Sequence, residues 1–419
     1  MRYKLLLTSA FFVTSAIAVA QNANRAFAIT GDGNNDFIWM NIRQVDLGTG
    51  QISRPVFERS KSNFILTDVN TKIVSSKVTA ENGNIFQAKD YPTGSMVAAA
   101  AYDRRSDKLF FSPMRVGELR WLDLNIKNET PHFFTLSSEA LNFGNPQDEA
   151  NHITRMVIAA DGNGYAVTND GNHLVRFTTG KKPVITDLGN LMDDEKNNGV
   201  SIHNKCTSWG GDMLADAMGK LYIISANRNV FVIDIDSRIA TYKGAIKGLP
   251  ENYTTNAAAV NADGDIVVSS ANVFEGYYTV KLNDLTATSI AGSDKRYNAS
   301  DLANGNLLLQ KESDAIRKYS VTAARLLENT FGNTDKRVFP NPVTASTFAV
   351  LFDNQKAGDY SITLTDLSGR ILQTQKVNII KGAQTAKISL LSRPSRGMYM
   401  VKVYDDSKQI VFTEKVLIQ

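Results

Sequence analysis

The sequence predicts an all-β protein with a long repetitive part and a short C-terminal part. Within residues 21–327, turns rich in Asp, Asn and Gly are followed repeatedly by short runs of β-branched and aromatic residues. Asn-Gly and Asp-Gly turns between apolar strands are the strongest short-range hairpin signal, because both central residues need positive φ angles. After residue 338, apolar residues alternate with polar ones, which is the period of strands with one buried face. We therefore expect antiparallel sheets in both parts.

The composition is that of an ordinary globular protein, with 43% hydrophobic and 21% charged residues among 419. The net charge of +4 is spread along the chain without a block of Lys or Arg, so nothing indicates a nucleic-acid partner or an anionic membrane. The single cysteine, Cys206, excludes an intrachain disulfide, and we expect it to be buried as a small hydrophobic residue.

The N-terminus has the three features of a secretory signal peptide, predicted over residues 1–20. A short basic start (residues 1–4) precedes an apolar run (residues 5–19), and Ala18 and Ala20 form the small-x-small pattern of a cleavage site before Gln21. No other apolar run is long enough to span a membrane. We expect an exported protein that passes through the periplasm and has no transmembrane segment in its mature chain.

Five turn-and-strand units recur through the long part. Each is followed by a second strand, and several of these alternate apolar and polar residues. The five turns, each with the strand that follows, are 103–107 with 108–111, 161–164 with 165–167, 216–219 with 220–224, 263–265 with 266–268, and 303–305 with 306–309. A unit of three or four antiparallel strands that recurs at intervals of roughly 40 to 60 residues is typical of β-propeller blades.

One further hairpin, residues 26–29 with 38–47, lacks a preceding inner strand. This is expected where the two ends of the chain close a propeller ring, and counting this hairpin gives six blades over residues 21–327. Residues 72–89 hold extra strand-like sequence, so a seventh blade or a decorated blade stays open. A β-sandwich and an irregular β-solenoid are the alternatives to a propeller.

A polar linker at residues 328–337 leads to the C-terminal part, residues 338–419. Tyr360, Ile362 and Leu364 form the apolar face of one strand, and Met398, Met400 and the aliphatic part of Lys402 that of another. Short strands with frequent turns indicate a small Ig-like β-sandwich. Pro340 and Pro342 cannot donate to a sheet, so they are expected at its leading edge.

The C-terminal part also carries an ordered series of motifs: Pro-Asn-Pro, Gly-x-Tyr, Asp-Leu-Ser-Gly, a second Gly-x-Tyr and a basic-aliphatic end. The residues that define the series are Pro340, Asn341, Pro342, Gly358, Tyr360, Gly369, Gly397, Tyr399 and Lys415. The series resembles the type A C-terminal sorting domain of the Bacteroidetes type IX secretion system. The resemblance implies recognition by the outer-membrane translocon, then removal of the tail and attachment of the rest to surface lipopolysaccharide. The protein is therefore expected on the outer-membrane surface or in the medium.

Two long loops are the best places for a ligand site. Residues 141–152 and 191–204 precede the inner strands of neighbouring blades, so the loops are expected to meet on the face that surrounds the central funnel. The candidate ligand-binding residues are Asp148, Glu149, His152, Asp193, Asp194, Glu195, His203, Asn204 and Trp209.

A divalent metal or a sugar is the specific hypothesis for these loops. Carboxylate and carbonyl oxygens suit Ca²⁺ or Mg²⁺, and the two histidines suit Zn²⁺ better. The alternative is a pair of solvated acidic loops whose histidines cap strand ends. The sequence requires no cofactor, and a divalent cation stays open.

Two further patterns resemble binding sites. Residues 32–36 look like a calcium loop, but Phe37 replaces the glycine of the tight turn and Arg43 the bidentate glutamate, so we expect a hairpin turn. The tryptophans could form a sugar platform. Trp121 is expected in the core, and no position is predicted for Trp39. Trp209 lies near the two loops and is therefore the better candidate for a sugar platform.

No motif identifies an enzyme. The chain has no G-x-S-x-G and no Gly-rich phosphate loop before a helix. The favoured function is a non-catalytic module that binds extracellular glycan or protein. A metal-assisted hydrolase or lactonase with its site in the funnel is the first alternative, and a structural or adhesion component of the surface is the second. Carboxylates and histidines from several blades that face one funnel favour the enzyme, and an uncharged or flat aromatic face favours binding. A filled funnel without a small-molecule site favours the structural role.

Overall fold

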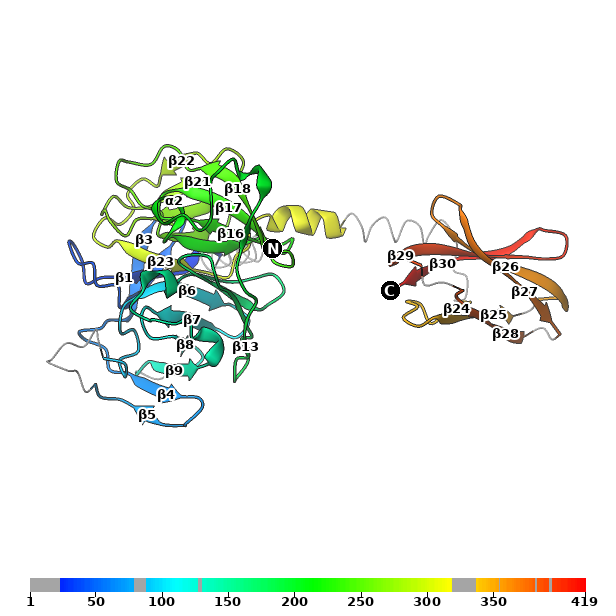
Figure 1. The fold of residues 1–419 in the computed structure, drawn as a ribbon, viewed down its shortest axis with the longest axis horizontal. Helices are drawn as coiled ribbons and strands as arrows, with labels where there is room; N and C mark the ends of the chain where they lie inside the picture. The colour runs from blue at the N-terminus through cyan, green and yellow to red at the C-terminus, as the bar shows by residue number, and fades with distance from the viewer. Residues whose placement is uncertain are drawn as a thin grey trace, which may run out of the picture. The chain divides into compact units, whose positions relative to one another are not determined.

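The computed structural model describes residues 23–78, 88–126, 130–318, 337–353, 355–380, 383–391 and 394–419. The chain divides into two compact units, Met1–Arg317 and Lys318–Gln419 (Figure 1). The predicted signal peptide with its cleavage site, and the linker up to residue 336, lie outside the described residues. The domain boundaries drawn from the sequence stay predictions.

The first sheet of the propeller joins the two ends of the unit. Strand β23 forms its inner edge and pairs antiparallel with β1, so the last strand of the ring and the first share one blade. The predicted ring closure is therefore confirmed. From the inner to the outer edge, the strands are β23 (Ala299–Ala303), β1 (Arg25–Thr30), β2 (Asn41–Asp46) and β3 (Gln51–Phe57).

The other blades follow in chain order, and each begins with its innermost strand. Blade 2 contains β6 (Val97–Asp103), β7 (Lys108–Pro113), β8 (Glu118–Asp123) and β9 (His132–Ser137). Blade 3 contains β10 (Ile153–Ile158), β11 (Gly164–Thr168), β12 (Leu174–Phe177) and β13 (Ile185–Asp187). Blade 4 contains β15 (Asp212–Ala215), β16 (Lys220–Ile224), β17 (Asn229–Asp234) and β18 (Ile239–Ala245). Blade 5 contains β19 (Ala257–Val260), β20 (Ile266–Ser269), β21 (Tyr278–Val280) and β22 (Ala287–Ser289).

Two blades carry additional outer strands. In blade 2, β4 (Ile65–Asp68) lies parallel to β9 and pairs with β5 (Val74–Ser75). In blade 4, β14 (Met192–Asp193) lies parallel to β18. The extra strand-like sequence predicted at residues 72–89 therefore contributes β5 to blade 2, whereas its residues 79–87 lie outside the described part.

The described residues form five blades, and the predicted count of six is wrong. The turn at 303–305 is not followed by a strand: Leu308 makes a single bridge to Asp216, and a helix occupies 310–318. The strand before that turn is β23, which completes the blade of the N-terminal hairpin. The sequence-based count thus assigned the two halves of blade 1 to two blades.

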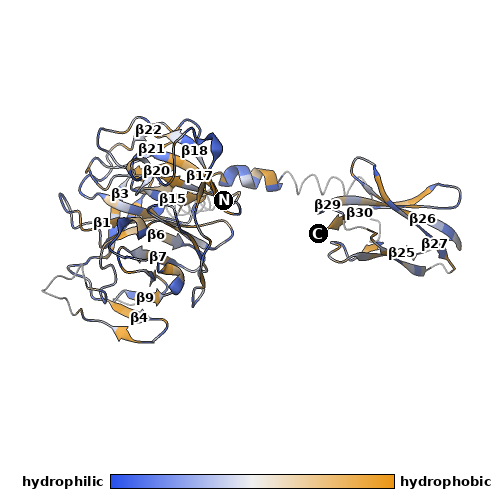
Figure 2. Cartoon of the chain, viewed as in Figure 1, coloured by the Kyte–Doolittle hydropathy of each residue, from blue (hydrophilic) through white to orange (hydrophobic). Residues whose placement is uncertain are grey.

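The core lies between the blades. Side chains of one strand alternate between its two neighbours: Phe27 and Ile29 of β1 pack with blade 2, whereas Ala26 and Ala28 pack with blade 5. Five apolar clusters of this kind fill the five interfaces, and hydrophobic residues lie mainly in the strands (Figure 2). Trp121 is buried between blades 2 and 3, as predicted.

The centre of the ring is narrow and filled. The inner strands contact one another in the order β23, β6, β10, β15, β19 and back to β23, and several of them are rich in alanine. The space enclosed by Ala100, Met156, Met213, Ala258 and Leu302 is about 10 Å³, barely enough for one water molecule. No open funnel crosses this level of the axis.

The second unit is a two-sheet sandwich, which confirms the predicted fold. One sheet contains β24 (Val338–Phe339), β25 (Thr347–Asp353) and β28 (Ala383–Ser389). The other contains β27 (Ile371–Ile379), β26 (Gly358–Asp366), β29 (Gly397–Tyr404) and β30 (Ile410–Ile418). Pro340 and Pro342 are exposed and follow β24, which is an edge strand, as expected.

The buried face of one sandwich strand differs from the prediction. Tyr360, Ile362 and Leu364 of β26 are buried as expected, but on β29 the buried residues are Tyr399, Val401 and Val403. Met398, Met400 and Lys402 are on the opposite face. Both faces of β29 carry apolar residues, so alternation alone could not decide which one enters the core.

Several residues of the C-terminal motif series hold the sandwich together. Asn341 donates to the backbone oxygen of Lys415 (2.8 Å) and accepts from the Leu417 N–H (2.9 Å), which ties the start of the unit to its last strand. The hydroxyls of Tyr360 and Tyr399 each donate to a carbonyl four residues upstream, at 2.7 Å. The two Gly-x-Tyr motifs thus make the same local contact, similar to a tyrosine corner.

Helices are few and short in the described residues. Three are 3₁₀ turns, and none is long and apolar enough to cross a membrane. They are η3 (Glu139–Leu141), η4 (Glu149–Asn151), η5 (Glu195–Asn197) and α2 (Lys205–Ser208), with a further helix over 310–318.

Candidate ligand site on the loop face

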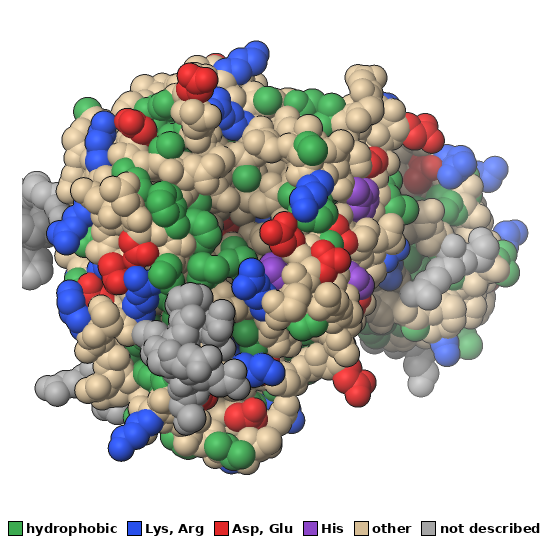
Figure 3. All heavy atoms as spheres, turned by 60° about the vertical axis from the view of Figure 1, so that its left-hand side comes forward, with side chains coloured by type: hydrophobic (Ala, Val, Ile, Leu, Met, Phe, Trp, Pro, Cys, Tyr) green, Lys and Arg blue, Asp and Glu red, His purple; other side chains and the backbone are tan. Residues whose placement is uncertain are grey.

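One face of the propeller, the loop face, is formed by the segments that lead into the inner strands. On the face seen in Figure 3, hydrophobic side chains lie toward the middle, and charged side chains and histidines lie around them. The described segments of the loop face are 88–96, 138–152, 188–211, 246–256 and 290–298, with the β1–β2 loop at 31–40.

The first predicted loop, 141–152, is held by its own polar residues. The Asp148 side chain accepts from the Ala150 N–H (3.0 Å) and caps η4. His152 is buried, and its Nε2 lies 2.9 Å from the Pro146 carbonyl oxygen. Two of the candidate residues therefore fix the shape of the loop, as N-caps and loop staples do.

The second predicted loop, 191–204, uses its acidic residues in the same way. Asp193 accepts from the Ile202 N–H (2.8 Å). Asp194 caps η5 and accepts from the Thr241 hydroxyl, and the Lys196 N–H and this hydroxyl lower the pKa of its carboxyl. Asn204 caps α2 through the Cys206 N–H (2.9 Å), whereas Glu195 is exposed.

His203 and Trp209 connect this loop to its surroundings. The two ring nitrogens of His203 lie 2.7 Å from the Asp170 carbonyl oxygen and 3.1 Å from that of Leu191. Trp209 donates from Nε1 to the His203 carbonyl (3.2 Å). Both ring nitrogens of His203 thus face backbone oxygens, and neither is directed at a ligand.

The ends of the two loops lie close together. Lys205, which directly follows the second predicted loop, pairs with Glu149 of the first at 3.4 Å, and its Nζ lies 4.8 Å from the ring centre of Trp209. Cys206, next to it, is exposed rather than buried, because the residue of α2 that faces the core is Ser208. The expectation of a buried cysteine is wrong.

The geometry gives little support to a metal site. In the described part of the chain, no group of three or more His, Cys, Asp and Glu side chains converges as metal ligands. The candidate carboxylates accept N–H groups of their own loops, and the histidines face carbonyls. Ligand binding by these residues stays a prediction.

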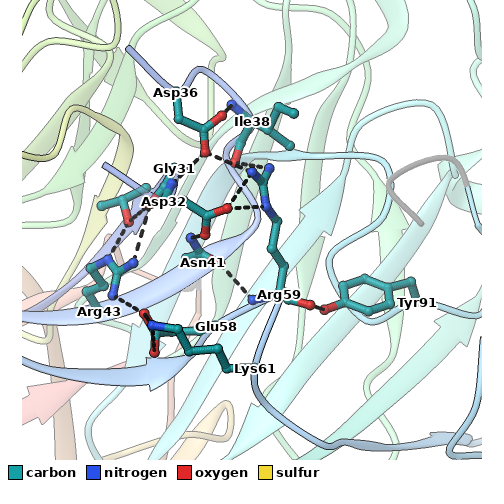
Figure 4. A network of polar contacts seen from close by, with 11 residues as sticks. Gly31, Asp32, Asp36, Ile38, Asn41, Arg43, Glu58, Arg59, Lys61 and Tyr91 are labelled. Carbon is teal, nitrogen blue, oxygen red and sulfur yellow. Dashed lines mark hydrogen bonds and ion pairs between the residues drawn. The ribbon is translucent and has the colours of Figure 1, made fainter. Parts of the chain in front are cut away.

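The acidic loop at residues 32–36 holds a guanidinium group (Figure 4). Arg59 contacts Asp32 (2.6 Å) and Asp36 (2.9 Å), and Asn41 donates to the other oxygen of Asp32 (2.7 Å). Burial raises the pKa of Asp32, but these partners outweigh burial and bring that pKa below its usual value. Strands β1 and β2 flank this loop as an antiparallel hairpin, which agrees with the predicted turn.

Two carboxyls meet at the axis of the propeller. Asp212 of blade 4 accepts from the N–H groups of Met213 (2.7 Å), Ala258 (2.6 Å) and Leu302 (3.2 Å), and so links blades 4, 5 and 1. Inner strands have no neighbour on their axial side, so their free N–H groups need such acceptors. The second carboxyl is Asp301 of blade 1, which faces Asp212.

Burial favours one shared proton on the two axial carboxyls. Both residues are fully buried, and burial raises the pKa of each carboxyl above its usual range. Neither oxygen of Asp301 has a hydrogen bond of good geometry to a donor in the described residues. Because three N–H donors favour the ionised form of Asp212, the proton is best placed on Asp301.

A buried arginine reinforces the axis. Arg155 of β10 is fully buried and donates to the carbonyls of Thr168, Ser208 and Gly210, which ties blade 3 to the loop of blade 4. The axis therefore contains carboxylates and a guanidinium from several blades, but all of them are sealed from solvent. Sealed groups cannot reach a substrate.

An open cavity lies between blades 2 and 3 on the loop face. Its volume is about 190 Å³, and it is lined by the β7–β8 turn and the first predicted loop. His152 lines it, but Arg115, Asn142 and Phe143 were not singled out from the sequence. Phe143 stacks on His173 at 4.4 Å between ring centres, and His173 pairs with Asp187 at 2.7 Å.

Comparison with known proteins identifies the C-terminal unit. The family model of the secretion system C-terminal sorting domain matches residues 337–419. The predicted type IX sorting domain is therefore confirmed, and it marks the chain for export to the cell surface or the medium. No match to the sequence was found among the curated proteins.

Solved structures resemble the chain only distantly. PorZ of Porphyromonas gingivalis, a surface component of the type IX secretion system, is 13% identical with a TM-score of 0.31, over 94% of this chain and 52% of PorZ. The chain thus spans about half the length of PorZ. A putative 6-phosphogluconolactonase of Bacteroides uniformis is 9% identical with a TM-score of 0.31, over 65% of this chain and 98% of that one. Virginiamycin B lyase of Staphylococcus aureus is 10% identical with a TM-score of 0.28, over 77% and 84%. Similarities this distant carry no argument about activity.

Proposed function

We propose that the mature chain is a non-catalytic binding protein, displayed on the cell surface or released, that binds extracellular glycan or protein through the loop face. The outer-membrane translocon recognises the sorting domain and exports the protein; the tail is then removed, and the rest is attached to surface lipopolysaccharide. The observation that carries the proposal is the contrast between a filled axis and an open cavity on the loop face. Ligands bind in concave sites with a few placed polar groups.

A hydrolase or lactonase in the funnel receives less support. Such a site needs carboxylates or histidines that reach a substrate, and Asp212, Asp301 and Arg155 are fully buried. The filled axis also fits the structural or adhesion role, which the same experiment addresses.

A thermal melt of the mature full chain, followed by tryptophan fluorescence, tests the proposal. Trp39, Trp121 and Trp209 all lie in the propeller, so the signal reports that unit alone. A ligand at about 100 times its Kd stabilises the folded state by about 2.7 kcal/mol, which is visible as a higher melting temperature.

The panel contains bacterial and plant glycans, outer-surface proteins, and divalent cations with an EDTA control. The proposal is supported if a glycan or protein raises the melting temperature and EDTA does not reverse this increase. A shift that requires a divalent cation favours the metal-dependent enzyme. If no member of the panel raises the melting temperature, the structural role is favoured.

Export has its own test. Deletion of residues 338–419 is expected to trap the protein in the periplasm. If the truncated protein still reaches the medium or the cell surface, the sorting role assigned to the tail is incorrect.

A further inference from the structure

We infer that the cavity between blades 2 and 3 binds a carboxylate-bearing sugar residue of an extracellular glycan, with Arg115 as its counter-ion and Phe143 as its stacking surface. This inference rests on the proposed function and names the ligand class for one site on the loop face. The cavity of about 190 Å³ is smaller than the roughly 300–1,000 Å³ of typical small-molecule sites, which suits one sugar residue rather than a long chain.

The charge of the residues that line the cavity indicates an anionic ligand. Arg115 is the one charged residue among the described residues that line it. Other arginines near the loop face are neutralised, for example Arg120 by Glu118 (2.8 Å) and Arg59 by Asp32 (2.6 Å). Arg115 is exposed and has no hydrogen-bond or ion-pair partner among the described residues. A guanidinium fork matches a carboxylate in a bidentate pair.

The turn that carries Arg115 holds it at the rim. Its φ is +67°, in the left-handed region that non-glycine residues seldom adopt, and Gly117 of the same turn has φ +64°. The β7 and β8 strands on either side are paired through residues 108–111 and 120–123. The backbone of Arg115 is therefore set by the hairpin, and the side chain starts from a defined position beside the cavity.

The aromatic wall of the cavity indicates a sugar ring. Phe143 is held on one side by the ring of His173, at an interplanar angle of 28°, and His173 is fixed by Asp187. This stack leaves Phe143 as a supported apolar surface that also lines the cavity. The C–H faces of sugars pack on such rings, whereas an isolated carboxylate gains nothing from them.

Two amides provide partners for hydroxyl groups. Asn142 is exposed and has no side-chain hydrogen bond among the described residues. Asn151 donates its Nδ2 to the Asn145 carbonyl (2.9 Å), which leaves its Oδ1 as an acceptor. Cation, aromatic ring and amides together match a uronic acid better than a neutral sugar or a simple anion.

The other large cavities lack this combination. The cavity of about 500 Å³ around the 310–318 helix pairs two of its cations internally, with Lys281 on Asp265 (2.6 Å) and Lys311 on Asp263 (4.0 Å), and none of the described residues that line it is aromatic. The cavity of about 460 Å³ between blades 4 and 5 is lined by Lys243 and Lys247, but the tyrosine at its wall, Tyr222, is buried and donates to Asp216. It provides a matched control.

Titration of the mature full chain with digalacturonate and with a neutral glucose disaccharide tests the inference. We expect the acidic disaccharide to bind at least tenfold more tightly, and less tightly at 1 M salt, because an exposed ion pair is screened. Arg115→Gln should weaken binding at least tenfold and Arg115→Lys less, and Phe143→Ala should weaken it as well. Lys247→Gln, which removes an unpaired cation from the other cavity, should leave binding unchanged.

Several outcomes overturn the inference. These are equal binding of the acidic and neutral disaccharides, no binding of digalacturonate, an unchanged Arg115→Gln variant, or loss of binding in Lys247→Gln. Tryptophan-detected melts of the variants show whether a loss reflects unfolding, and Arg115→Lys keeps the test valid if the glutamine variant does not fold. If a neutral glycan or a protein from the panel binds while digalacturonate does not, the inference fails and the proposed function stands.

Discussion

The shared proton at the axis predicts that replacing one buried acid will stabilise the propeller. In Asp301→Asn, the amide Nδ2 donates to Asp212 without any proton from solvent. The amide oxygen still faces the Ala100 N–H, which acts on Asp301 in the native protein. The substitution keeps the size of the side chain and removes its titration.

The magnitude follows from proton linkage. Aspartate in an unfolded chain has a pKa of about 3.9, whereas burial holds the folded pKa of both Asp212 and Asp301 well above that value. A raised folded pKa stabilises the protein fully below about pH 4, and this contribution is lost as the pH rises through the folded pKa. One retained proton costs about 1.4 kcal/mol per pH unit, or about 4 kcal/mol between pH 5 and pH 8.

Urea unfolding of the full chain at pH 5, 6, 7 and 8, followed by tryptophan fluorescence, measures the effect. The free energy of unfolding of Asp301→Asn should exceed that of the native protein by an amount that grows by about 4 kcal/mol over this range. Other titrating groups cancel in the difference. Asp212→Asn is the control: its amide cannot accept all three N–H groups, and each lost bond costs about 1–3 kcal/mol, so it should destabilise at every pH.

The reasoning is refuted if the native and Asp301→Asn curves stay parallel from pH 5 to pH 8. Parallel curves mean that the folded pair holds no more protons than the unfolded chain. A variant that is less stable at every pH would show instead that the amide cannot replace the protonated carboxyl.

Three further predictions concern packing and loop contacts. Trp121→Ala should lower the free energy of unfolding by about 3–5 kcal/mol, because the ring is buried between blades 2 and 3. If Trp121→Ala loses no more stability in urea than Trp209→Ala, the assignment of Trp121 to the core is contradicted. Arg59→Gln leaves the carboxylates of Asp32 and Asp36 without their cation, so a protease should cut residues 31–40 faster in limited proteolysis. The control is Lys61→Gln, which removes an exposed ion pair with Glu58 and should not change the rate of cleavage. Asn341→Ala removes two hydrogen bonds to β30 and should therefore lower the melting temperature of the sandwich, measured by near-UV tyrosine signals. It should also lower the yield of exported protein. A lower melting temperature with unchanged export would show that the stability of the sandwich and its sorting role are separate.

Local turn chemistry made most of the strands predictable. The turns at 103–107, 161–164, 216–219 and 263–265 each join an inner strand to the next one, because Asp, Asn and Gly there accept the angles that a hairpin needs. The blade count failed at β23, whose partner β1 lies at the other end of the unit. Pairing between the ends of a ring leaves no local signal.

The candidate site was predictable only as a pair of loops. Their position on one face and their meeting were deduced from topology, but Asp148, Asp194 and Asn204 proved to be caps of short helices. A short polar residue before a turn has the same appearance whether it caps a helix or binds a ligand. Arg115 was missed because its turn reads as an ordinary hairpin connection.

The axial pair shows a second limit. Asp212 and Asp301 are far apart in the sequence and meet only because blades 4 and 1 face each other across the ring. No local motif can reveal such a pair, since its two carboxyls come from the inner strands of different blades.

Hydrogen–deuterium exchange of the mature full chain, with and without the glycan or surface protein that gives the largest melting shift, tests the central claim most directly. The account predicts a ligand that binds and slows exchange in loop-face segments, chiefly residues 112–117 and 141–153, while the inner strands around Asp212 and Asp301 exchange as before. If no glycan or protein binds, or if protection appears only in those inner strands, the propeller does not act as a loop-face binding module.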